Sequence, residues 1–223
     1  MRLQNKGQST QRLTIALGLH FRSAAMNVRK LIIFCAMILL SGCGGGGGGE
    51  DPVSQVDERL ARLDDYAALN LRVLGDLDGM TPTPVAAVPD TGTAVFDGFA
   101  TIRVEHPGQH LVLYGDATVS IGFSDNSVDG TMDRFFGTDA TGSVVDYSGA
   151  IVVDGGAINE GLSLGYAGVL AHGADELVFD GTMMGEFLGN PLAAISAADL
   201  ESAVVYNGEV IDATVIIVGE VGT

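Results

Sequence analysis

The sequence contains no tryptophan and only two cysteines, Cys35 and Cys43, both in the first fifth of its 223 residues. No disulfide framework is therefore available to the rest of the chain. Lysine is absent after residue 42, and the whole chain has 11 basic side chains against 28 acidic ones, a formal charge of −17. This balance argues against nucleic acid as a partner, because binding phosphates requires clustered Lys and Arg.

The two ends of the chain differ in charge. Residues 1–42 hold six basic residues and no acid, whereas residues 43–223 hold five arginines and all 28 acids, a formal charge of −23. Such a split predicts a targeting segment followed by an acidic exported domain.

Residues 26–43 carry the pattern of a signal peptide. A basic stretch (MNVRK, 26–30) precedes ten apolar residues (LIIFCAMILL, 31–40) and then Ser-Gly-Cys. Ten helical residues span about 15 Å, half of the roughly 30 Å hydrocarbon core, which indicates a signal segment and not a membrane span. Residues 40–43 (LSGC) match the bacterial lipobox, so the segment resembles lipoprotein signal peptides. The alternative is a plain secretory signal in which Cys43 occurs by chance.

The resemblance implies that Cys43 carries the lipid and becomes the first residue of the mature chain. Met26 opens a complete signal by itself, so we expect residues 1–25 to be an upstream extension. Gly44 follows the cysteine where retained lipoproteins have Asp, which implies the outer membrane of a Gram-negative bacterium. Two or three acyl chains anchor firmly to a membrane. Whether the domain faces the periplasm or the cell surface stays open.

A tether and a helix are expected next. Residues 43–50 comprise the lipidated cysteine and a run of six glycines, a flexible linker. An acid followed by Pro52 is typical of a helix start, and we expect a helix over residues 51–78. Glu58 and Arg62 are spaced for an i,i+4 pair. The apolar stripe is expected at Val53, Val56, Leu60, Leu63, Ala67 and Leu74, with Asn70 in the same seam.

That stripe has two readings. It could form a coiled coil with another chain, or it could pack on its own domain or plug one end of it. Three heptads barely reach the length of a stable coiled coil, so we favour packing on its own domain. Residues 79–92, with three prolines, are expected to be a linker.

From residue 93 to the end of the chain, apolar and polar residues alternate in eight segments joined by turns. Asn207-Gly208 is the strongest hairpin signal. The connections are too short for parallel crossovers, which need about a dozen residues. We therefore predict an all-β fold, a single antiparallel eight-stranded soluble β-barrel preceded by a short helix and a lipoprotein signal. The expected strands are 93–105, 110–122, 128–137, 143–153, 160–171, 176–187, 202–206 and 209–220.

The apolar face should point inward, with glycines beside large residues as in a narrow barrel. Acids alternate with the apolar positions and are expected outside, at Asp97, Asp129, Asp133, Asp146, Asp180 and Asp212. A membrane-spanning barrel is disfavoured because aromatic residues are only 6% of the chain. The predicted core comprises Phe96, Ile102, Leu113, Ile121, Leu164, Phe179, Met183 and Phe187.

Residues 179–195 (FDGTMMGEFLGNPLAAI) resemble the C-terminal barrel signature of transferrin-binding protein B-like surface lipoproteins, and residues 119–130 are similar to a hairpin of that family. Asn190 and Ser196-Ala197 depart from its pattern, and only one barrel is present. The resemblance implies the barrel fold and an anchored surface location, where the barrel would act as a binding or accessory module. The partner classes we expect are a protein or a haem- or iron-related ligand. The signature positions are Phe179, Gly181, Gly185, Phe187, Gly189, Pro191 and Ala193.

Catalytic motifs are weak. Gly161–Gly165 satisfies G-x-S-x-G, but Ser163 falls inside a predicted strand instead of a strand-to-helix turn. The segment 125–130 starts like a calcium loop but has Phe136 at the twelfth position, so an Asx turn is expected. His106 and His110, beside Glu105, are weak candidates for a metal site. We expect no enzyme activity and no cofactor; the alternative function is a carrier of haem or another apolar molecule inside the barrel.

Overall fold

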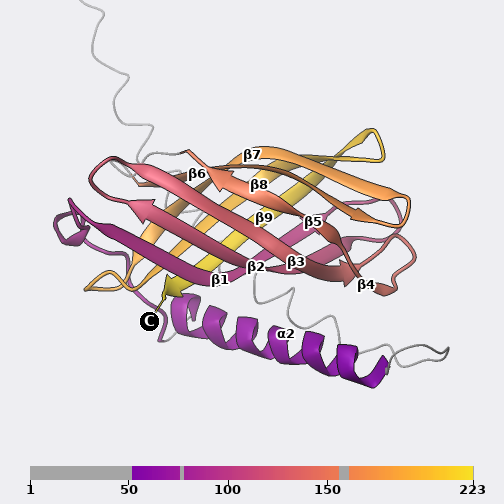
Figure 1. Cartoon of the computed structure of the whole chain (residues 1–223), viewed down its shortest axis with the longest axis horizontal. Helices are drawn as coiled ribbons and strands as arrows, with labels where there is room; N and C mark the ends of the chain where they lie inside the picture. The colour runs from indigo at the N-terminus through magenta and orange to yellow at the C-terminus, as the bar shows by residue number, and fades with distance from the viewer. Residues whose placement is uncertain (1–51, 76–77, 156–160, 223) are drawn as a thin grey trace, which may run out of the picture. The chain divides into compact units, whose positions relative to one another are not determined.

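The acidic part of the chain forms a closed barrel with one helix lying against its outer wall (Figure 1). The computed structural model describes residues 52–75, 78–155 and 161–222, with side chains of the helix from residue 58 onward. All of them belong to one of the two units into which the chain divides, Cys43–Thr223. The predictions for the signal segment, Cys43, the glycine run, Val53 and Val56 concern residues outside this description.

One α-helix, one 3-10 turn and nine strands make up the described residues. They are α2 (Pro52–Leu74), η1 (Val85–Ala87), β1 (Thr93–Val104), β2 (Leu111–Gly122), β3 (Ser127–Thr138), β4 (Val144–Asp146), β5 (Ser148–Asp154), β6 (Leu162–His172), β7 (Asp175–Leu188), β8 (Ala194–Tyr206) and β9 (Glu209–Val221).

The strands follow one another around the barrel as an antiparallel meander. Each strand pairs with the next one in sequence, except that β4 does not pair with β5, and β9 pairs with β1. β4 and β5 both pair with β3 and are separated by Tyr147, so they occupy one of eight wall positions. The predicted eight-stranded antiparallel barrel is confirmed.

Most predicted boundaries lie within two residues of the observed ones, but the seventh strand was predicted wrongly. β8 begins at Ala194 and not at residue 202. Its first half (AISAADLE) is rich in alanine and lacks the alternation that marks a strand. The fourth predicted strand is divided into β4 and β5.

The helix and the segment after it also differ from the prediction. The helix ends at Leu74 and not at residue 78, and Gly75 follows its last residue. The segment 79–92 is not a free linker, because Pro82 forms a β-bridge with Leu188 and the Thr83 N–H donates to the Phe187 carbonyl (2.8 Å). These contacts attach the segment to the end of β7.

The barrel interior is filled by side chains. Every residue of the predicted core is buried, none more than 6% exposed. Glycines leave room for aromatic rings: a Cβ on Gly115 would lie 2.6 Å from the Phe135 ring, and one on Gly181 would lie 2.5 Å from the Tyr166 hydroxyl oxygen. The alternation of small and large residues therefore indicates a packed tube.

A second apolar cluster lies outside the barrel wall, beneath the helix. Strand β9 is buried on both faces here, with Val215 and Ile217 in the barrel core and Ile216 and Val218 under α2. The buried apolar residues outside the barrel core are Tyr66, Leu69, Val73, Leu74, Phe99, Tyr114, Phe136, Leu188, Ala194, Ile216 and Val218.

The predicted helix stripe was right only in part, because Leu74 is buried as expected but other predicted positions are not. Leu60 is 53% exposed and Ala67 is also exposed, whereas Tyr66, Leu69 and Val73 are buried. The buried face keeps the expected spacing but starts from arginines, whose aliphatic stems cover apolar surface while their charged ends reach acids. The favoured reading, a helix that packs on its own domain, is confirmed; the helix lies on the wall and does not plug an end.

A bulge in β3 determines what faces the helix. The β2–β3 register shifts between Tyr114 and Asp116, and Arg134 adopts a positive φ of 50°. The extra residue reverses the alternation, so Phe135 enters the core and Phe136 turns outward beneath the helix.

The outer wall is acidic, as predicted. Five of the six acids expected outside are exposed, and Asp133 is half-buried. Among the described residues, no helix has the length and hydropathy of a membrane span.

Candidate functional site

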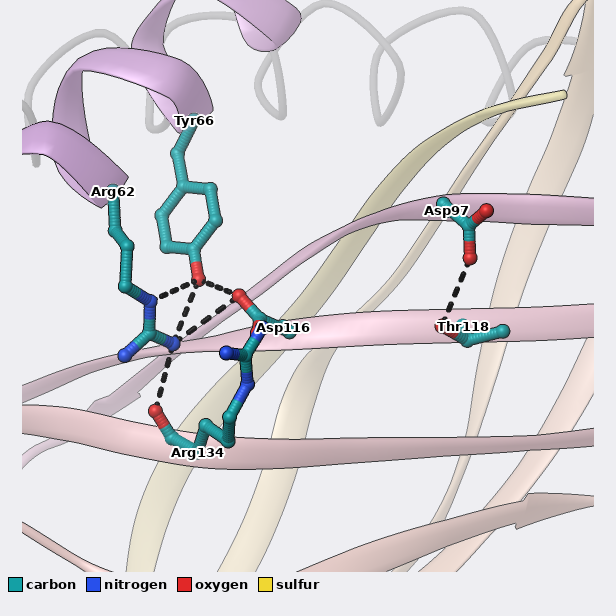
Figure 2. A network of polar contacts seen from close by, with 6 residues as sticks. All are labelled: Arg62, Tyr66, Asp97, Asp116, Thr118 and Arg134. Atoms are coloured by element: carbon teal, nitrogen blue, oxygen red, sulfur yellow. Dashed lines mark hydrogen bonds and ion pairs between the residues drawn. The ribbon is translucent and has the colours of Figure 1, made fainter. Parts of the chain in front are cut away.

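The helix joins the barrel through a polar network around Asp116 (Figure 2). The Arg62 Nη2 donates to Asp116 Oδ1 (3.1 Å) and to the Arg134 carbonyl (2.8 Å). The Tyr66 hydroxyl donates to the same carboxylate, and the Arg134 guanidinium forms an ion pair with it. One half-buried carboxylate of β2 thus binds a guanidinium and a phenol of α2 and a guanidinium of β3.

Aromatic contacts surround this network. The Tyr66 ring stacks on Phe99 with centroids 5.0 Å apart, and the Arg62 Cζ lies 4.8 Å from the centre of the Phe136 ring. Burial raises the pKa of Tyr66, although the neighbouring Arg62 opposes this shift. The phenol therefore stays protonated at neutral pH and acts as a donor.

Two further arginines of the helix pair with acids of the barrel. Arg59 pairs with Asp146 of β4 (Nε to Oδ1, 3.0 Å), and Arg72 pairs with Glu220 of β9 (Nη2 to Oε2, 2.8 Å). Arg62 pairs with Asp116 of the barrel and not, as expected, with Glu58. All five arginines after residue 42 form ion pairs, three of them between helix and barrel.

The two candidate metal ligands point to different partners. The His110 Nδ1 lies 2.7 Å from Glu105 Oε2, whereas the His106 ring packs edge-on against Tyr206, with centroids 5.0 Å apart. The His106 Nδ1 is buried without a hydrogen-bond partner. In the described ranges, no three His, Cys, Asp or Glu side chains cluster closely enough to hold a metal ion.

The described histidines all lie at one end of the barrel, beside two buried tyrosines. Tyr147 packs near His172, and burial raises the pKa of its phenol. Burial, and then a hydrogen bond to Asp175, raise the pKa of Tyr206 to about 12. Sequence reasoning missed this cluster, because its members are far apart in the chain.

Another polar group lies inside the barrel at a bulge in β8. The Tyr166 hydroxyl is 2.9 Å from Asp199 Oδ2 and 2.6 Å from Ser202 Oγ. A pocket of about 270 Å³ adjoins it, lined by Leu200, Glu201, Ser202, Asp212 and Ala213. This group was missed because the first half of β8 was not recognised as a strand.

The remaining motifs have structural roles. Ser163 lies within β6 opposite Met184, so it is not on a nucleophile turn. Asp125 Oδ1 accepts from the Ser127 N–H (3.2 Å) and hydroxyl (2.8 Å), which confirms the Asx turn.

The positions predicted from the resemblance to the transferrin-binding protein B-like signature fall on β7 and the turn after it. Phe179 and Phe187 enter the core, and Gly181 and Gly185 lie where a Cβ would meet Tyr166 or β8. The other three predicted positions, Gly189, Pro191 and Ala193, lie in the β7–β8 turn. Gly189 has a φ of 92°, and the Ala193 N–H donates to the Leu188 carbonyl.

Neither a protein-family model nor a curated protein matches this chain. The inferences below therefore depend on the sequence motifs and on the geometry.

Proposed function

We propose that this protein is a lipid-anchored outer-membrane protein whose acidic barrel is a non-enzymatic binding or accessory module. The observation that carries the proposal is the lipobox at residues 40–43, which is followed directly by six glycines and an acidic domain. A thiol beside small residues is the acceptor that lipid transfer requires, and multiple acyl chains anchor firmly.

The helix–barrel unit suits such an anchored module. The helix follows the tether in the chain, and three arginines fasten it to β2, β4 and β9. Force or motion transmitted through the tether would thus reach a rigid barrel, whose loops and walls are available to a partner.

The packed interior favours this function over a carrier with a ligand inside the barrel. The rings of Phe96, Phe135, Tyr166 and Phe179 are at most 2% exposed, so neighbouring side chains already pack against them. A haem would have to displace these rings.

Replacing the lipidation residue tests the proposal. We expect Cys43→Ala to move the protein from the membrane fraction to the soluble fraction, because no thiol remains to accept lipid. Fractionation followed by mass spectrometry of the N-terminal peptide measures both location and acylation. Cys35→Ala, the matched control, should leave the protein acylated; a Cys43→Ala protein that stayed in the membrane would refute the lipid anchor.

A further inference from the structure

A row of apolar side chains crosses the outer wall of the barrel, away from the helix. Four successive cross-strand pairs connect five strands: Ala150 with Val169, Val169 with Val178, Val178 with Val205, and Val205 with Val210. Residues paired in this way present their side chains to the same face of a sheet. We call these five residues the valine row.

The valine row is open to solvent. Val169 is 42% exposed, Val205 is 37% exposed and Val210 is 75% exposed, although their chain neighbours Leu170 and Val204 are fully buried. Other exposed apolar residues of the wall, such as Val95 and Met184, lie outside this row, whereas the row places four valines on four adjacent strands. Contiguous exposed apolar surface of this kind is typical of an interaction site.

Acidic residues border the row on both sides. Glu176 lies on one side of the row, and Asp180 and Asp212 lie on the other side. Residues 148–222, which include β5 to β9, contain eleven acids and no Lys or Arg. The wall therefore combines an apolar centre with a negative rim.

The packing of α2 shows how an amphipathic helix binds to another part of this outer wall. Tyr66, Leu69 and Val73 cover an apolar part of the outer wall, and arginines beside them pair with barrel acids. The valine row offers the same chemistry with no helix of the described chain on it. Acid–acid repulsion disfavours a second copy of this wall or an anionic lipid surface as its occupant.

We propose that the valine row binds an amphipathic helix of another polypeptide, one with an apolar stripe flanked by Lys or Arg. The row spans four interstrand steps, about 19 Å, which corresponds to roughly 13 helical residues. Apolar contact supplies the affinity, and the acidic rim selects basic partners. This inference does not depend on the lipid anchor: a chain without lipid is tested in the same way in buffer, and an acylated chain is tested in nanodiscs.

A designed peptide tests the proposal with the whole chain in phosphatidylcholine nanodiscs. The probe is a fluorescent 14-residue helix with leucines at i, i+3, i+4 and i+7 spacing and arginines beside them, and binding is measured by anisotropy against empty nanodiscs. We expect saturable binding that the triple variant Val169→Thr, Val205→Thr, Val210→Thr weakens about tenfold. Threonine keeps the shape and strand preference of valine, so the barrel remains folded.

Val95→Thr is the matched control, because Val95 is 41% exposed on β1, outside the row. It should leave binding unchanged. A peptide with glutamates in place of arginines should not bind, and one with serines in place of leucines should bind at least about tenfold more weakly.

Three results would overturn the proposal. The serine peptide could bind as tightly as the leucine peptide, which would mean that only the negative charge of the wall attracts it. The triple variant could bind the leucine peptide as tightly as the unaltered chain, or Val95→Thr could weaken binding as much as the triple variant does. Self-association of the chain that the triple variant abolishes would assign the row to a second copy instead, and would equally refute it.

Discussion

At the scale of single residues, glycines of the inner face determine where aromatic side chains lie. Gly181 is the clearest case, because the Tyr166 ring occupies the space of its missing side chain and reaches Asp199 and Ser202 beyond it. The glycine is therefore needed for packing and for satisfying a buried hydroxyl.

Gly181→Ala should lower the free energy of unfolding by about 1–3 kcal/mol, because the added methyl group overpacks the core against Tyr166. Urea denaturation measures the change. Gly219→Ala adds the same methyl group where the nearest atom, the Phe96 Cβ, would be 3.3 Å away. We expect this control to change stability by less than about 1 kcal/mol, and equal effects would contradict the packing argument.

The buried tyrosines predict an alkaline loss of stability. The pKa of Tyr206 is about 12 in the folded protein, above the ordinary value of 10. Between these values the unfolded phenol releases its proton while the folded one keeps it, so stability falls as pH rises from about 10 to 12. Tyr206→Phe should make this fall shallower in denaturation measured at a series of pH values. If the stability of Tyr206→Phe fell with pH above 10 as steeply as that of the unaltered protein, the raised pKa of Tyr206 would not be the cause of the alkaline loss. This comparison requires that the two stability curves run parallel below pH 9.

At the scale of elements, the helix is attached to the barrel through the Asp116 carboxylate, and the β3 bulge brings further partners to that carboxylate. The bulge brings Arg134 and Phe136 to the outer face, where Asp116, Arg62 and Tyr66 meet them. Asp116 is the shared partner, and its loss would leave two guanidiniums and a phenol without their acceptor.

Asp116→Asn keeps one acceptor oxygen but removes the negative charge and places an NH2 donor beside the guanidiniums. It should therefore destabilise the protein by about 1–3 kcal/mol and increase hydrogen exchange in the helix before the barrel. Hydrogen-exchange mass spectrometry distinguishes the two regions. Arg72→Ala breaks a more exposed pair with Glu220 and should cost less than about 1 kcal/mol. If exchange rose equally in helix and barrel, the helix would not be a separately fastened element.

At the scale of the whole molecule, negative charge dominates. Residues 43–223 hold 28 acids and five arginines, so we expect repulsion among the acids to exceed what the five arginine ion pairs offset. The molecule depends on its packed barrel to hold these charges together.

Raising the salt concentration from about 10 mM to 0.5 M should increase the Tm, because the Debye length falls from about 30 Å to less than 10 Å and screens this repulsion. Differential scanning calorimetry checks the shift, with sucrose at equal osmolality as the control. A lower Tm in salt would mean that the helix–barrel ion pairs outweigh the repulsion.

The barrel itself followed from the sequence because its signals are local. Alternation assigns Phe96, Leu113 and Phe179 to one face, and Asn207-Gly208 defines a hairpin with φ values of 50° and 89°. Short connections then exclude any parallel arrangement. The predictions were wrong where alternation was weak, in the alanine-rich start of β8, and where a residue had two possible roles, as on the helix.

The order of residues alone determined the fold class, the inward apolar face and the acidic exterior, since each depends on neighbours within a few positions; the lipobox is likewise a local pattern, and the lipid anchor that it indicates stays a prediction. Only the tertiary structure decided which helix face is buried, that Arg62 meets Asp116, that Tyr166 fills the space beside Gly181, and that four valines from four strands stand in one row. These features depend on strand register and on one bulge, which bring distant residues together and leave no periodic trace in the sequence.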